Sequence, residues 1–229
     1  MMNVMISVAA LVAYVFFLVR FARQSIIWFR ASRHAAAYPI FLTKVPASVY
    51  ITTVLDILFF RRIFNTSKLL WTGSWIFHIS FFFVILRHTR YFFPSLPDCL
   101  ILLQPVGLIA GYLLPLSLLY IIALRTVQKK DRYASSYNYV ISGMLFFIST
   151  IGLTMRMFFR PDLLSVKQFA LGIFGLSPQP LPDSMLFFLH IGLFLLLLPF
   201  LPPHIIAAPF VNLEANRRME ELRYVIHER

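Results

Sequence analysis

The sequence predicts an all-α integral membrane protein, and three observations carry this prediction. The 229 residues are 59% hydrophobic and only 13% charged, whereas an ordinary soluble domain has about 25% charged residues. The mean hydropathy is +0.78, and Phe alone occurs 25 times. Five apolar runs approach the roughly 20 residues that a helix needs to cross a bilayer. We expect one membrane domain over residues 1–229.

Each apolar run is long enough to span, and a helix satisfies every backbone polar group within one segment. The sequence lacks the alternating strands of about ten residues that a closed barrel needs. In the first run the positive charges follow the apolar residues, the reverse of a cleavable signal peptide, so we expect an uncleaved helix. The expected spans are approximately 4–28, 69–93, 100–124, 136–159 and 182–206.

The distribution of positive charge predicts the topology. Of the 21 Lys and Arg residues, sixteen fall between Arg20 and Lys68, between Arg125 and Arg132, and in the tail from Arg217 onward. Because cytoplasmic loops collect positive residues, we expect the N-terminus outside and the C-terminus in the cytoplasm, in a multi-pass protein of the inner (cytoplasmic) membrane. The net charge of +12 has the same origin, and we expect no nucleic-acid partner.

Three further segments are amphipathic. Residues 51–70, ITTVLDILFFRRIFNTSKLL, have apolar residues at helical spacing and basic residues near the end, which predicts an interfacial helix over about 48–66. A docking surface for a cytoplasmic partner is a compatible interpretation. Residues 161–182 are expected to lie outside and to cap the last two spans. The tail, 211–229, mixes charges at helical spacing, as is typical of a short solvated or partner-bound helix.

The single cysteine, Cys99, limits the cofactors that this chain can hold. One cysteine excludes an intrachain disulfide framework and a cysteine-ligated iron–sulfur cluster within the chain. The sequence also lacks the C-x-x-C-H haem attachment motif. Any redox cofactor must therefore be bound noncovalently by other ligands.

Four of the six histidines lie within apolar spans, whereas His34 and His227 fall in basic segments where surface positions are expected. An isolated intramembrane histidine is more often a hydrogen-bonded packing residue. Ionisable groups at membrane depth are nevertheless costly and tend to face the bundle interior, so four of them together are candidate ligands. They are His78 and His88 in the second span, and His190 and His204 in the fifth.

The spacing of these histidines predicts two pairs. At about 100° per residue, intervals of ten and fourteen residues leave the members of each span within roughly 80° and 40° of one another. The two spans run in opposite directions, so His88 comes level with His190, and His78 with His204. Two imidazoles from facing helices form the axial clamp of a b-type haem, which suits electron transfer. We therefore expect two haems, an outer and an inner one.

The two histidines of the inner pair match each other in membrane depth less well than those of the outer pair. His78 and His88 are roughly 15 Å apart along an ideal helix, and His190 and His204 roughly 21 Å. Helix tilt and the three prolines that precede His204 can absorb part of this difference. A one-haem form, with His78 free or otherwise ligated, stays open.

Zinc is the competing metal, and it would need three or four ligands converging at one depth. The histidines split into two levels without an accompanying acidic residue, and a metal transporter would carry intramembrane Asp or Glu along its path. The acidic residues near the spans all stand at segment ends: Asp98, Asp131, Asp162 and Asp183.

Residues 75–88, WIFHISFFFVILRH, and 188–200, FLHIGLFLLLLPF, resemble the second and fifth helices of the respiratory nitrate reductase gamma-subunit-like b-type cytochromes. These proteins have five spanning helices, with a His-x9-His pair on the second. The string RHTRYFFPSLP, 87–97, is most similar to the membrane subunits of sulfate-reducer electron-transfer complexes, of the sulfite-reductase-associated and high-molecular-weight cytochrome types. The family separates its fifth-helix histidines by about eighteen residues, whereas this chain has fourteen.

The resemblance implies quinol chemistry. Such subunits transfer electrons between menaquinone and a cytoplasmic iron–sulfur partner, a cysteine-rich, heterodisulfide-reductase-like subunit of an anaerobic respiratory complex. A periplasmic multihaem cytochrome c and other membrane subunits are further expected partners of the sulfate-reducer type. The chain is not expected to act on a soluble substrate alone. The alternatives are a heterodisulfide-reductase-type membrane subunit using another lipid-soluble carrier, and a non-redox membrane anchor whose histidines only pack.

Several outer-side polar groups are candidates for pairing with haem propionates or a quinone carbonyl, because Arg suits carboxylate recognition. Snorkelling to the membrane interface is their alternative role. Since they bracket His88, Arg87 and Arg90 are assigned to the propionates. The full set is Arg87, Arg90, Tyr91, Arg156, Arg160 and Lys167.

Overall fold

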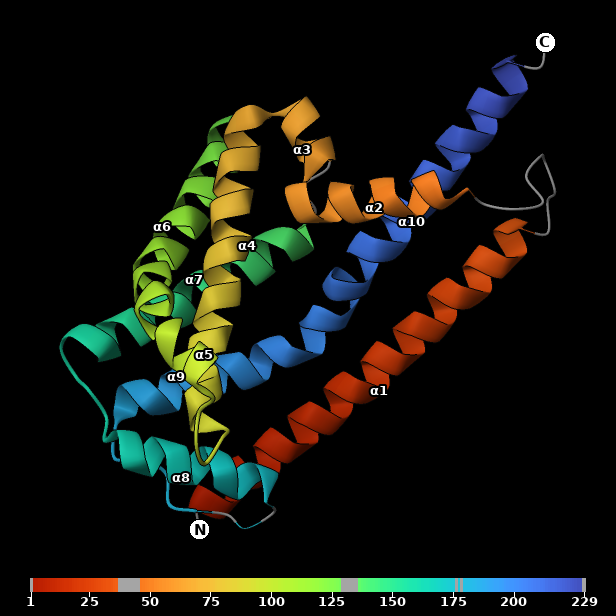
Figure 1. Ribbon diagram of the computed structural model, residues 1–229. Coiled ribbons are helices and arrows are strands. Elements are labelled where there is room, and N and C mark those ends of the chain that lie inside the picture. The colour runs from red at the N-terminus through yellow and green to blue at the C-terminus, as the bar shows by residue number, and fades with distance from the viewer. Residues whose placement is uncertain (1, 37–45, 129–135, 176, 178, 228–229) are drawn as a thin grey trace. The chain divides into compact units, whose positions relative to one another are not determined.

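The computed structural model describes residues 2–36, 46–128, 136–175, 177 and 179–227, and every regular element in these residues is helical (Figure 1). The predicted all-α class is therefore confirmed over the described part of the chain. The helices are α1 (Met2–Ala36), α2 (Ala47–Phe59), α3 (Arg61–Thr66), α4 (Lys68–His88), η1 (Thr89–Tyr91), α5 (Asp98–Leu102), α6 (Gln104–Gln128), α7 (Ser136–Met157), α8 (Leu163–Phe174), α9 (Met185–Leu197), η2 (Leu198–Phe200) and α10 (Leu201–His227).

Within the described residues, five helical segments are long and apolar enough to cross a membrane, and each overlaps one of the five expected spans. The expected orientation, with the N-terminus outside, stays a prediction. Part of the charge pattern behind it falls in 37–45 and 129–135, which lie outside the described residues. The five segments are Val4–Ala31, Lys68–Tyr91, Gln104–Val127, Ser136–Met157 and Met185–Arg223.

The chain divides into two compact units, which are described separately. The first consists of Met1–Tyr14 and Leu69–Leu198, and the second of Val15–Lys68 and Pro199–Arg229. The first unit therefore contains α4 to α9, and the second contains α2, α3 and α10. The prediction of one membrane domain over 1–229 stays a prediction.

The first unit has two apolar cores. In one, Phe77 of α4 packs against Leu114, Leu118 and Ile121 of α6, all of them buried. The three side chains of α6 recur at intervals of four and three residues, the spacing that puts an apolar stripe on one helix face. This core fixes α4 against α6 over the middle of both helices.

The second core lies where α7, α8 and α9 meet. Its buried members are Met155 of α7, Val166 and Phe169 of α8, and Phe187 of α9. The α8 helix starts at Asp162, whose carboxylate accepts hydrogen bonds from the backbone N–H groups of two residues in the first turn, which is the usual role of Asp at an N-cap. The expected amphipathic helix within 161–182 is thus α8, and it packs on the last two spans of the unit.

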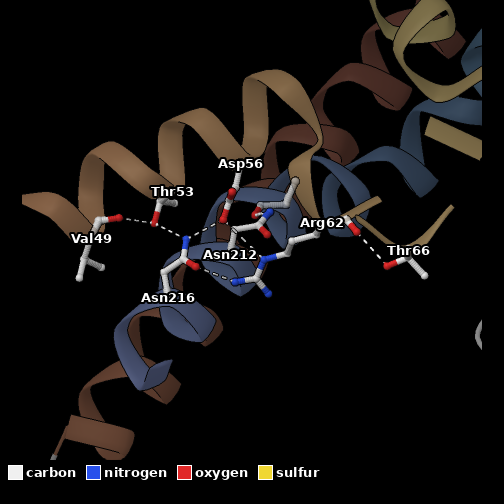
Figure 2. A network of polar contacts seen from close by, with 8 residues as sticks. Val49, Thr53, Asp56, Arg62, Thr66, Asn212 and Asn216 are labelled. Carbon is white, nitrogen blue, oxygen red and sulfur yellow. Dashed lines mark hydrogen bonds and ion pairs between the residues drawn. The ribbon is translucent and has the colours of Figure 1, made fainter. Parts of the chain in front are cut away.

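In the second unit, α2 packs along α10. A short network of polar side chains, drawn in Figure 2, joins the two helices through Asp56 and Asn216. Phe60 takes a left-handed conformation, with φ of 49°, and this residue separates α2 from α3. The expected interfacial segment 48–66 is therefore two helices that turn at Phe60.

The fifth apolar segment is interrupted once, at the prolines. Pro199 lies in the 3-10 turn η2, between α9 and α10. Pro202 and Pro203 lie in the first turn of α10, where the missing N–H of proline leaves no hydrogen bond unmade. The helix can therefore restart at Leu201, and it continues through the charged tail to His227.

Candidate functional site

The site is built around His88, the last residue of α4. Its Nδ1 lies 2.7 Å from the carbonyl oxygen of Val84, one turn earlier in the same helix. A carbonyl oxygen only accepts, so Nδ1 carries the proton and donates. The other ring nitrogen, Nε2, is then the basic one that can bind a metal ion.

His190 has the same protonation state as His88, but its hydrogen-bond acceptor lies in a different helix. It lies in α9, and its Nδ1 donates to the carbonyl oxygen of Ile148 in α7 at 3.0 Å. Gly152, one turn further along α7, makes room for the ring: a Cβ atom there would stand 3.0 Å from Cε1 of His190 and 3.4 Å from Nδ1. We call Ile148 and Gly152 the α7 socket.

The structure brings His88 and His190 together. Their ring centroids are 6.4 Å apart, and the ring planes are within 10° of parallel. Helix α9 packs along α7. His190 is half-buried, and His88 is exposed beside it.

The second predicted pair is divided between the two units. His78, in α4, has its Nδ1 at 2.7 Å from the carbonyl oxygen of Ser74, the same arrangement as at His88. Its ring stands 4.7 Å, edge to face, from that of Phe77. His204 belongs to α10 and is exposed within the second unit. The pairing of His78 with His204 stays a prediction.

Arg87, next to His88, points toward α6. Its guanidinium donates to the backbone carbonyl of Gln104 at 2.5 Å. A Cβ atom at Gly107 would stand 2.8 Å from Cβ of Arg87, so this glycine lets the two helices approach at the arginine. The side-chain amide of Gln104 donates to the carbonyl of Leu100, while its Oε1 is buried without a hydrogen-bond partner in the described structure.

The positive charges of Arg90 and Arg156 also act on Arg87, and those of Arg87 and Arg90 act on His88. The Arg90 guanidinium donates to the Tyr91 hydroxyl at 2.6 Å and lies 4.7 Å from the centre of that ring. The Tyr91 ring in turn stands 5.9 Å from that of His88. Arg87 and Arg90 thus lie near His88, and Arg156 acts on Arg87.

The two remaining candidates have local partners. Arg160 is exposed and donates through Nε to the carbonyl of Arg156 at 3.0 Å. Lys167 of α8 donates to the carbonyl of Pro94 at 2.7 Å, which ties α8 to the segment after η1. Among the described residues, no group of three or more His, Cys, Asp or Glu side chains converges in a way that could hold a metal ion.

A comparison with known proteins bears on this histidine pair. The chain is similar to a membrane cytochrome b-like protein. This relative is the "Hdr-like menaquinol oxidoreductase cytochrome b-like subunit" of Archaeoglobus profundus, 27% identical over 155 residues, which are 59% of this chain and 45% of the relative. The chain thus matches less than half the length of that protein.

This distant similarity supports a membrane cytochrome b-like family and a multi-pass membrane protein. It does not extend to the nitrate reductase gamma subunits, whose resemblance stays an expectation from the sequence. No family model matches the chain. No solved structure matches it either.

Sequence reasoning missed the α7 socket and Gln104. Ile148 acts through its backbone carbonyl, which has no residue signature, and a glycine within an apolar helix has several explanations. The burial of one side-chain oxygen of Gln104 follows from the packing of α4 on α6. The available signal for Gln104 was a polar residue at the start of an apolar span, 16 residues from His88.

Proposed function

We propose that this chain is a membrane cytochrome b subunit of a quinol-linked oxidoreductase complex, and that His88 and His190 hold its outer haem. The observation that carries the proposal is the ring pair itself. An imidazole nitrogen bonds a metal ion at about 2.0 Å, and a ring centroid lies about 1.2 Å behind that nitrogen. Two imidazoles that hold one iron between them would have centroids about 6.4 Å apart, and the separation between His88 and His190 is 6.4 Å.

The hydrogen bonds of the two rings support the same assignment. Metal-binding histidines almost always donate their other ring N–H to a carbonyl or carboxylate, which fixes the tautomer and the ring orientation. Val84 and Ile148 accept these bonds, so both Nε2 atoms are basic. The pair differs from a zinc site, which needs three or four protein ligands.

A haem with two histidine ligands supplies one-electron transfer and has no open position for oxygen chemistry. The residues of this chain orient it and offset its charge. Arg87, Arg90 and Arg156 place like charges near one another, which is costly at membrane depth unless anions neutralise them. Haem propionates are such anions, and guanidinium groups bind carboxylates with two parallel hydrogen bonds. Arg160 is a more peripheral candidate for the same role.

Menaquinone is the proposed electron carrier. The relative's name combines "Hdr-like" with "menaquinol", which favours a menaquinol-linked subunit over the same architecture with another lipid-soluble carrier. A quinol needs an acceptor for its hydroxyl group, and the partnerless Oε1 of Gln104, beside the Arg87 guanidinium, is a suitable buried acceptor. His78 and His204 would hold an inner haem, and the proposed partner is a cytoplasmic, heterodisulfide-reductase-like iron–sulfur subunit.

A difference spectrum tests the proposal against a non-redox anchor. The full chain is purified in detergent, and its dithionite-reduced minus oxidised spectrum is recorded together with a pyridine haemochrome assay. We expect a b-type α-band and two haems per chain. A count of one haem per chain would mean that only the outer site binds haem. Reoxidation of the reduced protein by a menaquinone analogue should be slower in Gln104→Leu than in the unmodified chain. If the spectrum shows no α-band, the haem proposal is wrong and the chain is a non-redox membrane anchor.

A further inference from the structure

Helix α2 has its polar side against protein and its apolar side exposed. Val49, Thr53 and Asp56 are buried, whereas Ile51, Val54 and Leu58 on the opposite side are 62%, 53% and 59% exposed. A surface helix in water does the reverse, because it turns its apolar stripe to the core and its polar residues to solvent. The outer side of α2 therefore needs an apolar environment that the described residues do not provide.

The polar side is held in place by a closed hydrogen-bond network, which we call the Asp56 clasp (Figure 2). The side-chain amide of Asn216, on α10, donates to Thr53 Oγ1 at 3.1 Å and to Asp56 Oδ2 at 3.0 Å. Arg62, at the start of α3, donates to Asn216 Oδ1 at 2.9 Å, and its Nε lies 3.7 Å from Asp56 Oδ2. Because these bonds fix the rotation of α2 about its axis, they also fix the outward direction of the apolar side.

The chain places α2 next to a spanning helix. Only α3, six residues long, lies between α2 and the start of α4, and the candidate span begins at Lys68. Six helical residues measure about 9 Å, so the end of α2 is within the reach of the interfacial layer. The charges agree with this position: Asp56 is the one acidic residue of 47–68 and is buried, while Arg61 and Lys68 are exposed.

We propose that α2 binds the bilayer surface at the leaflet where α4 begins, with Ile51, Val54 and Leu58 among the acyl chains. Arg61 and Lys68 would meet anionic headgroups, which attract basic residues beside an amphipathic helix. Of the two interpretations that the sequence left open, lipid contact and a docking surface for a partner, the reversed amphipathy supports the first. The Asp56 clasp then fixes the level of Asn216, and with it the point where α10 leaves the membrane.

Site-directed spin labelling of the full chain tests this. Cys99, the single cysteine, is exposed, so Cys99→Ala gives a background for single-cysteine variants. Val54→Cys labels the apolar side of α2, and Asn65→Cys, at an exposed polar position of α3, is the matched control. Both are reconstituted in phosphatidylcholine vesicles with and without phosphatidylglycerol, and the collision rates of the label with oxygen and with a water-soluble nickel chelate are measured.

We expect the Val54 label to collide several-fold more with oxygen than with the nickel chelate, and the Asn65 label to show the opposite preference. Phosphatidylglycerol should deepen the Val54 label, and Arg61→Gln should reduce that shift. Equal exposure of both labels to the nickel chelate would overturn the proposal. A Val54 label shielded from both reagents would also overturn it, because it would indicate protein contact. Leu58→Cys repeats the test should Val54→Cys not fold.

Discussion

The two compact units each contain a polar cluster among apolar side chains, and the clusters use their hydrogen bonds differently. In the Asp56 clasp, the amide, carboxylate and guanidinium groups are all paired with one another. In the pair of His88 and His190, Nδ1 of each ring is bound to a backbone carbonyl, and the two rings lie nearly parallel with their centroids 6.4 Å apart.

This difference separates a structural cluster from a functional one. Buried polar groups that satisfy one another stabilise an arrangement, and removing a member leaves the others unpaired at a cost. Two basic nitrogens of neutral imidazoles cannot hydrogen-bond each other, because both are acceptors. The proposed haem iron would instead be bound by these two nitrogens. Substitutions in the two clusters should accordingly change different properties.

The largest effect is expected at the histidines. His190→Ala or His88→Ala should abolish the outer haem, because an iron held by two imidazoles loses half of its axial ligands. The measurement is the haem-to-chain ratio by pyridine haemochrome, with His227→Ala, outside the spans, as the control. Retention of the full haem content in both variants would refute the assigned pairing.

The next effect is expected in the α7 socket, where two glycines of one helix can be compared. A Cβ atom at Gly152 meets the His190 ring, whereas one at Gly143 meets nothing within 4 Å. Alanine is favoured over glycine inside a helix by about 1 kcal/mol, so Gly143→Ala should be neutral or stabilising. Gly152→Ala should displace the ring from its carbonyl acceptor.

Electron paramagnetic resonance of the oxidised haem measures that displacement, since the low-spin signal depends on the orientation of the two ligand planes. Gly152→Ala should shift the signal and lower the haem content, and Gly143→Ala should leave both unchanged. Identical spectra for the two variants would mean that the socket does not position His190, even though the haem is bound.

In the clasp, Asn216→Ala should lower stability and leave the outer haem spectrum unchanged. It leaves Asp56 and Thr53 without their shared donor, and an unsatisfied buried group costs about 1–3 kcal/mol. Glu214→Gln removes the exposed i,i+4 pair with Arg218, which is worth about 0.3–0.5 kcal/mol, and is the control on the same helix. Thermal unfolding in detergent compares them, and an equal loss in both would deny the clasp its structural role.

The smallest effect concerns pH at the start of α8. The Ser165 hydroxyl, followed by the backbone N–H groups of Ser165 and Leu164, lowers the pKa of Asp162 below its ordinary value. A lowered folded-state pKa means that the cap stabilises α8 above the unfolded pKa and is lost as the pH falls through the folded one. The protection of the Leu164 and Ser165 amides, expressed relative to the intrinsic exchange rate at each pH, should fall on acidification, and in Asp162→Ala it should be low at every pH.

The sequence was sufficient for features that depend on regular geometry. The five spans follow from apolar length, and the approach of His88 to His190 follows from helical spacing and antiparallel spans. Contacts that use the backbone or that join distant segments were not predictable. Asp56 and Asn216 are 160 residues apart, and nothing in either local pattern names the other. The tail was expected to be a short helix, and it forms the end of the longer α10, which begins at Leu201 and continues to His227.

One proline in α10 has a mechanical consequence. Pro209 lies inside the helix, between His204 and the clasped Asn216, and it removes one rung of the backbone ladder and pushes against the preceding turn. The helix thus consists of two rigid segments, and it can bend between them at Pro209. The segment after Pro209 is fixed to α2 through Asn216, while the segment that carries His204 can tilt without breaking any bond of the Asp56 clasp.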